Sequence, residues 1–235
     1  MIYIENMPEW GFGNRILYYN NLRQLSKTKQ KQWSCSPWLG YKYFTGDLLN
    51  GAQRGDEKLE PCLGDKFFEW NSISTREIFK LKETTSVNES TCAVHFRGTD
   101  FHHWNPNSIL SANYYIKSID MIKDSVKHFV LFTDDETLAS FSQVRTKLKN
   151  ENIIFSEGQN TCNRQNYIKD FSYMSECDWI ISSPSTFCIC AGFVGKKKKI
   201  IHSKNWVEDR ASRNEQFWVD LLNGGNEDYS MWGLV

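Results

Sequence analysis

CAVHFRGTDF, residues 92–101, joins an apolar run to a histidine, an arginine and an aspartate. If residues 92–96 form a central parallel strand, His95 and Arg97 point to the same face, because side chains alternate along a strand. Both then lie near the carboxyl end of the strand, where open α/β sheets bind their ligands. A guanidinium in that position requires an anion. Either an ion pair with Asp100 or a bound ligand would supply it.

The sequence around this stretch alternates between strand and helix periods. The strand pattern occurs at residues 2–5, 92–96, 128–133, 152–156, 178–182 and 199–202. The helix pattern occurs at residues 14–27, 112–123, 136–149, 167–177 and 184–194. From residue 92 onward, strands and helices alternate regularly, which predicts a parallel sheet with helices on both faces. The chain is therefore expected to have an α/β fold with a Rossmann-like domain.

The first third of the chain has a different character. Residues 30–90 carry tryptophans, prolines and glycines without a sustained period, which predicts loops and short elements on a small, irregular domain. The polar string at residues 83–90 is expected to cross between domains. These features divide the chain into an N-terminal domain, 1–88, and a ligand-binding domain, 89–210.

Composition limits the possible partners. The 235 residues are 40% hydrophobic, enough for one large core or two small ones. The 28 lysines and arginines balance 28 acidic residues, so no basic stripe indicates a nucleic acid or a membrane surface. Met1 leads into a strand pattern without a signal-peptide pattern, and no window approaches about 18 apolar residues. We therefore expect a cytoplasmic protein with no nucleic-acid partner and no transmembrane segment. The sequence does not indicate its oligomeric state.

The cysteines predict buried thiols rather than a metal site. No CxxC pair occurs among the seven cysteines at positions 35, 62, 92, 162, 177, 188 and 190. The one close pair, Cys188 and Cys190, is too isolated to be half of a zinc site. We expect reduced cysteines and no bound metal.

A glycine-rich turn, WGFGNR at residues 10–15, lies between the first strand and the first helix. Gly11 and Gly13 permit close approach of another molecule, and the start of a helix attracts anions. A tight turn between strand and helix explains the same residues equally well.

A second helix start follows the strand at residues 178–182 in the sequence SSPSTF, residues 182–187. Ser183 suits the N-cap position and Pro184 the first helical position. Free backbone amides and the hydroxyls of Ser185 and Thr186 would then gather at the positive end of the helix. This arrangement predicts either a phosphate site or a plain capped helix.

The strand at residues 128–133 ends in FTDD, residues 132–135. Asp134 or Asp135 could accept hydrogen bonds from a ribose or a base, or could cap the next helix. Both interpretations remain open at this point.

Taken in order, these four motifs resemble the fucosyltransferase superfamily with the GT-B fold, which includes α-1,2-, α-1,6- and protein O-fucosyltransferases. GFGNR, residues 11–15, is similar to the superfamily's G-x-G-N-[QR] loop, and HFRGTD, residues 95–100, to its H-x-R-[RG]-x-D motif. FTDD resembles the acidic motif that follows. DFSYMSECDWIISSPSTF, residues 170–187, is similar to its pattern that ends in an S-[ST]-F phosphate loop. Residues 30–90 are not matched in detail.

The resemblance implies a fold and an activity. The fold would be GT-B, two Rossmann-like domains facing a cleft, with a C-terminal helix at 211–235 returning to the N-terminal, acceptor-side domain. The activity would be inverting, metal-independent transfer of L-fucose from GDP-fucose to a glycan hydroxyl, closest to the α-1,2 branch, without a cofactor. Another nucleotide sugar as donor, or a non-catalytic nucleotide- or sugar-binding module, is the alternative.

The resemblance also implies roles for individual residues. Arg97 would pair with the β-phosphate, and Asp100 would orient Arg97. These two are the expected catalytic residues. Ser185 and Thr186 would contact phosphate oxygens. The remaining expected donor-binding residues are Gly13, Asn14, Arg15, His95, Asp134, Asp170 and Phe187, the last two beside the nucleoside.

One position departs from the superfamily's pattern. Gly98 stands where many members carry a second arginine, which leaves Arg15 as the expected substitute. A general base for the acceptor hydroxyl is also expected, and Asp100, His102 and His103 are the nearest candidates.

Overall fold

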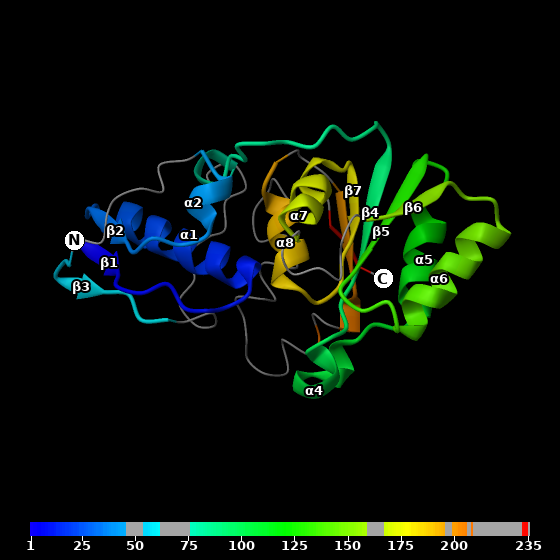
Figure 1. Cartoon of the computed structure of the whole chain (residues 1–235), viewed down its shortest axis with the longest axis horizontal. Coiled ribbons are helices and arrows are strands. Elements are labelled where there is room, and N and C mark those ends of the chain that lie inside the picture. The colour runs from blue at the N-terminus through cyan, green and yellow to red at the C-terminus, as the bar shows by residue number, and fades with distance from the viewer. Residues whose placement is uncertain are drawn as a thin grey trace.

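Two parallel sheets organise the chain (Figure 1). The computed structural model describes residues 1–45, 54–61, 76–158, 167–195, 199–205, 208 and 232–234. The smaller sheet has the order β2-β1-β3, and the larger sheet has the order β6-β5-β4-β7-β8-β9. All described strand pairs in both sheets are parallel. The predicted α/β class is confirmed.

The larger sheet is built around the stretch at residues 92–101. Its central strand β4, Thr91–Phe96, pairs with β5, His128–Thr133, on one side and with β7, Trp179–Ile181, on the other. The outer strands are β6, Phe155–Glu157, β8, Lys199–His202, and β9, Trp232–Leu234. All six residues of β4 are buried, as expected of a strand covered on both faces.

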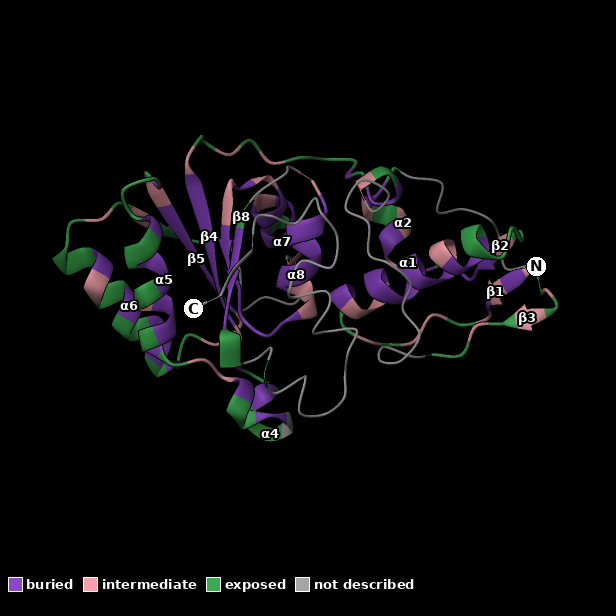
Figure 2. Cartoon of the chain, turned by 180° about the vertical axis from the view of Figure 1, so that it is seen from behind, coloured by how far each residue is buried: buried purple, intermediate pink, exposed green. Residues whose placement is uncertain are grey.

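Helices cover both faces of this sheet (Figure 2). Ala93, Val130 and Ile180 belong to the apolar cluster on the face of α7, Tyr167–Glu176, and α8, Thr186–Phe193. The alternate strand residues Val94, Leu131 and Ile181 belong to the cluster on the face of α5, Ala112–Ile122, and α6, Ala139–Asn150. The period-two alternation thus separates two apolar layers, and it directs His95 towards α8.

The smaller sheet is connected to the larger one through helix α1, Phe12–Thr28. The strands of this sheet are β1, Ile2–Ile4, β2, Trp33–Cys35, and β3, Glu57–Lys58. α1 packs against α8, and buried residues of both belong to one continuous apolar cluster. Among the described residues, the two halves therefore share a core, and the segment at 83–90 runs between them (Figure 1).

Two further short helices belong to different halves of the chain, α2, Gly40–Tyr43, to the N-terminal half and α4, Phe101–Trp104, to the half with the larger sheet. α4 begins immediately after the loop that follows β4. A single 3-10 turn, η1, Pro106–Ser108, lies between α4 and α5. The short elements predicted for residues 30–90 are confirmed where the chain is described.

Three elements begin two or three residues later than predicted. α8 begins at Thr186 with Ser185 as its N-cap, because Ser183 is drawn into a contact with His95. α6 begins at Ala139 rather than 136, because Asp135 holds the preceding residues in a turn. β6 begins at Phe155 rather than 152, because Asn152 adopts a φ of 54° in the turn that ends α6.

The C-terminal prediction is also corrected. Residues 232–234 form strand β9, which pairs with β8, so this part of 211–235 is neither helical nor in the smaller sheet. The rest of that predicted helix lies outside the described residues. Cys62 and Cys162 lie outside them as well, whereas the five described cysteines are buried and unbridged.

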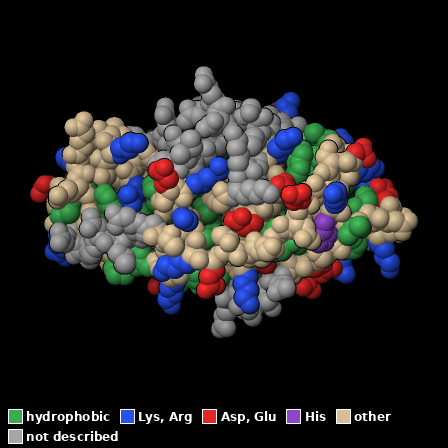
Figure 3. Space-filling view, turned by 90° about the horizontal axis from the view of Figure 1, so that it is seen from above, with side chains coloured by type: hydrophobic (Ala, Val, Ile, Leu, Met, Phe, Trp, Pro, Cys, Tyr) green, Lys and Arg blue, Asp and Glu red, His purple; other side chains and the backbone are tan. Residues whose placement is uncertain are grey.

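The surface agrees with a zero net charge. On the face shown in Figure 3, acidic and basic side chains are interspersed, with no patch of one sign. A search of the described residues finds no helix with the length and apolarity needed to cross a membrane.

Helix α1 approaches α8 so closely that position 13 has no room for a side chain. A Cβ on Gly13 would lie 2.4 Å from the backbone carbon of Thr186 and 2.5 Å from the backbone nitrogen of Phe187. We expect Gly13→Ala to lower the free energy of unfolding by about 2 kcal/mol or more, since backbone atoms cannot yield as a flexible side chain can. Urea denaturation measures this loss.

Gly11→Ala is the matched control for this substitution. A Cβ at Gly11 meets nothing within 4 Å, and its φ of −56° suits any residue. Its cost should stay below about 1 kcal/mol. Equal effects of the two variants would contradict a steric role for Gly13.

Candidate functional site

The order of the strands defines the place where a ligand would bind. From β4 the chain proceeds to β5 and β6 on one side, and it then returns to β7, β8 and β9 on the other. β4 and β7 are therefore neighbours whose following connections leave in opposite directions. Open α/β sheets bind ligands at such a switch point, outside the carboxyl ends of the strands. His95, Arg97 and Ser183 follow or end these two strands.

His95 links the two central strands at this point. Its Nδ1 lies 2.7 Å from Oγ of Ser183, and its ring lies 6.0 Å from that of Phe187. Burial lowers the pKa of His95 to about 4, because the charged imidazolium is poorly solvated there. His95 is thus a neutral, buried group at physiological pH, with one nitrogen already engaged.

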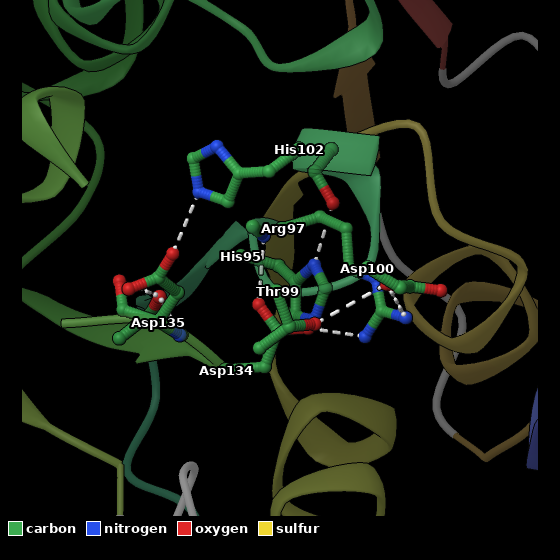
Figure 4. A network of polar contacts seen from close by, with 10 residues as sticks. His95, Arg97, Thr99, Asp100, His102, Asp134 and Asp135 are labelled. Carbon is green, nitrogen blue, oxygen red and sulfur yellow. Dashed lines mark hydrogen bonds and ion pairs between the residues drawn. The ribbon is translucent and has the colours of Figure 1, made fainter. Parts of the chain in front are cut away.

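Arg97 is held between two carboxylates (Figure 4). One guanidinium nitrogen donates to Asp134 Oδ2, and the other donates to Asp100 Oδ1 at 2.5 Å. Its guanidinium also lies over the ring of Phe101, 5.3 Å from the centroid. The Arg97 side chain is 28% exposed, whereas that of Asp100 is 60% exposed. Asp100 is therefore the partner that an incoming anion can replace most easily.

Asp134 fixes the loop that carries Arg97. Besides the guanidinium, it accepts hydrogen bonds from the backbone nitrogen of Gly98 at 2.7 Å and from the hydroxyl of Thr99 at 2.8 Å. Thr99 has a φ of 25°, an unfavourable conformation for a β-branched residue. Bonds to a charged acceptor offset this strain. Asp134 acts here as an anchor within the protein, and it does not cap α6.

Asp135 organises the other side of the same loop. Its Oδ1 accepts from the backbone nitrogen of Thr137 at 2.9 Å and from the Thr137 hydroxyl at 2.6 Å. Its Oδ2 lies 2.9 Å from Nε2 of His102 (Figure 4). A Cβ on Gly98 would lie 2.6 Å from the Cβ of Asp135. Position 98 must therefore be glycine for the Asp135 side chain to keep its place.

The remaining predicted residues lie at the junction of α1 and α8. Gly13, Asn14 and Arg15 are in the first turn of α1, and Gly13 lies directly against Thr186 and Phe187. Nε of Arg15 is buried without a hydrogen-bond partner in the described part of the chain. No described hydrogen bond connects Arg97 to this junction. The predicted residues thus form two groups, linked through His95 and Phe187.

Asp170 is a buried acid beside this junction. It lies in the first turn of α7, next to Phe171, whose ring is 5.3 Å from that of Phe187. Asp170 is 5% exposed and has no hydrogen-bond partner among the residues that the structure describes. Burial raises the pKa of Asp170 to about 7. Burial of a carboxylate is costly unless it accepts hydrogen bonds, and an incoming ligand can supply donors to it.

Sequence reasoning missed two parts of this site. Ser183 was assigned to the helix cap, although its hydroxyl contacts His95. The pairing of His102 with Asp135 was not foreseen, although both had been singled out separately. Consecutive aspartates at the end of one strand, opposite a loop with Arg97 and His102, were the available signal. No group of three or more potential metal ligands occurs in the described ranges.

The raised pKa of Asp170 predicts a pH-dependent stability. Between pH 3.8 and about 7 the unfolded carboxyl is ionised while the folded one keeps its proton, so this group lowers stability as the pH rises. Asp170→Asn removes that loss. We expect the variant to match the wild type near pH 4 and to exceed its free energy of unfolding by about 2–4 kcal/mol at pH 8.

Urea denaturation at both pH values measures the difference, and Asp124→Asn, the same substitution at an exposed position, is the control. A gain of equal size at pH 4 and pH 8 would contradict a cost that arises from the charge.

Comparison with known proteins adds no assignment to this geometry: neither a family model, nor a curated protein, nor a solved structure matches the chain.

Proposed function

We propose that this chain is an inverting glycosyltransferase with a GT-B-like arrangement, which transfers L-fucose from GDP-fucose to a glycan hydroxyl. The observation that carries the proposal is Arg97 at the carboxyl end of β4, beside the switch point and fixed by Asp134. The order of the four motifs, which resembles the fucosyltransferase superfamily, supports the choice of sugar.

The diphosphate would bind between Arg97 and the start of α8. An arginine binds phosphate through charge-assisted hydrogen bonds, and the N-terminus of a helix favours negative charge. Ser185 is the N-cap of α8, and its side chain makes no capping hydrogen bond, so its hydroxyl remains available to a phosphate oxygen. Asp100 would leave Arg97 when the phosphate arrives, and Asp134 would keep the guanidinium in place.

The nucleotide would carry guanine, because the carboxylate of Asp170 can accept hydrogen bonds from that base. Guanine presents two neighbouring donors, the ring N–H and the exocyclic amino group, and a carboxylate accepts two parallel bonds. Uracil offers one donor at the corresponding edge. Among the described residues, none is seen to donate a hydrogen bond to the buried carboxyl of Asp170, and the ring of Phe187 lies close to its helix neighbour Phe171. This pairing favours GDP over other nucleoside diphosphates.

The chemistry would be a direct displacement. The acceptor oxygen forms a bond to the anomeric carbon while the bond from that carbon to the β-phosphate oxygen breaks, and GDP leaves with the electron pair. Negative charge grows on the departing diphosphate. Arg97, which its two carboxylate partners hold in place, and the amides at the start of α8 would stabilise that charge in the transition state at little reorganisation cost.

Arg97→Ala should weaken GDP and GDP-fucose binding at least tenfold, because a charged hydrogen bond to a phosphate is worth about 1.5–3 kcal/mol. Isothermal titration calorimetry measures the affinities. Arg145→Ala on α6 is the control, since that arginine pairs with Glu157 outside the strand-end network. Unchanged affinity in Arg97→Ala would overturn the assignment of the phosphate site.

Asp170→Asn should reduce the preference for the guanine nucleotide. The amide places an N–H group against one of the two guanine donors, so we expect GDP affinity to fall at least tenfold and UDP affinity to change little. Competition titrations with GDP, UDP and ADP measure the preference. A wild type that binds all three equally would contradict guanine recognition and would favour a different nucleotide sugar as donor.

A further inference from the structure

His102 and Asp135 form an oriented imidazole–carboxylate pair beside Arg97. Asp135 is itself fixed by Thr137, which donates from both its backbone nitrogen and its hydroxyl. These bonds, followed by the one from His102, hold the pKa of Asp135 below its ordinary value. The carboxylate is therefore ionised and held in place, and its Oδ2 accepts a hydrogen bond from the Nε2–H group of His102, 2.9 Å away.

Such a pair leaves the second ring nitrogen as a proton acceptor. When Nε2–H donates to Asp135, the lone pair of Nδ1 is free to receive a proton. The His102 side chain is 47% exposed, whereas that of Asp135 is only 13% exposed. A ligand can thus reach the imidazole while the carboxylate remains behind it.

The position of His102 is coupled to that of Arg97. The backbone nitrogen of Phe101 donates to the carbonyl of Gly98 at 2.8 Å, and the Phe101 ring lies under the guanidinium. The short helix α4 therefore continues directly from the loop that carries Arg97. The two consecutive residues that follow β5 orient the two groups, Asp134 for Arg97 and Asp135 for His102 (Figure 4).

Other candidates for a proton acceptor at this edge are less suited. His95 is 6% exposed and already paired with Ser183. Oδ1 of Asp100 accepts from Arg97 and from Thr99. His103 is adjacent to His102, but no described hydrogen bond orients its side chain. Only His102 combines exposure with an orienting carboxylate among the described residues of the strand-end network.

We propose that His102, oriented by Asp135, is the general base that takes the proton of the acceptor hydroxyl. This inference rests on the proposed function. As the acceptor oxygen bonds to the anomeric carbon and GDP departs with the electron pair of the broken bond, the hydroxyl proton moves to Nδ1 of His102. The resulting imidazolium faces the carboxylate of Asp135, which stabilises its charge.

Hydrolysis of GDP-fucose tests the inference without knowledge of the acceptor, because water then serves as the acceptor and released GDP is measured. His102→Gln should slow GDP release about 100-fold or more, while GDP affinity measured by calorimetry stays within twofold. Asp135→Asn should slow it to a smaller extent, and His103→Gln should leave it unchanged. His103 is the matched control, since it lies on the same helix.

Azide separates a base from a merely structural residue. The azide anion carries no proton, so its attack on the sugar needs no base. Added azide should restore GDP release in His102→Gln, with fucosyl azide as the product, and should do so far less in Arg97→Ala.

Each other outcome has a separate meaning. Normal hydrolysis by His102→Gln, failure of azide to restore it, or a wild type that binds GDP-fucose without releasing GDP would each overturn the inference about His102. A wild type that binds neither GDP nor GDP-fucose would instead overturn the proposed function on which it rests.

Discussion

The carboxylate of Asp134 is the interaction on which the strand-end site depends. It binds the guanidinium of Arg97, the backbone nitrogen of Gly98 and the hydroxyl of Thr99 in one loop. Without this acceptor, the guanidinium would lose its less exposed partner, and the unfavourable φ of Thr99 would lose its support. Arg97 and its loop are therefore held in place in the free protein, which is what the proposed stabilisation of a leaving group requires.

The second constraint is the contact between α1 and α8. Because Gly13 lets the two backbones meet, the first turn of α1 lies beside the first turn of α8, and the two halves of the chain bury one shared apolar cluster. The glycine-rich turn therefore has a structural role in addition to any role towards a ligand. Close packing brings the first turn of α1, with Asn14 and Arg15, to the start of α8, whereas a role of this turn towards a ligand stays a prediction.

The sequence allowed most of the larger sheet to be predicted. Alternating apolar periods placed β4, β5, β7 and β8 correctly, because buried parallel strands and their covering helices leave strong patterns. Strand β9 could not be predicted, since its pairing with β8 is a long-range contact without a local pattern. In the candidate site, the alternation of side chains along a strand predicted that His95 and Arg97 share a face. The contact of Ser183 with His95 did not, because a serine before a proline suits a helix cap equally well.

Because Gly98 packs against Asp135, a substitution at one of these two distant positions constrains the residue at the other. Any side chain at position 98, including a second arginine, would displace the carboxylate that orients His102. A chain of this fold can therefore carry either a second cation in the loop or an oriented imidazole behind it, but it cannot acquire one by a single substitution without losing the other.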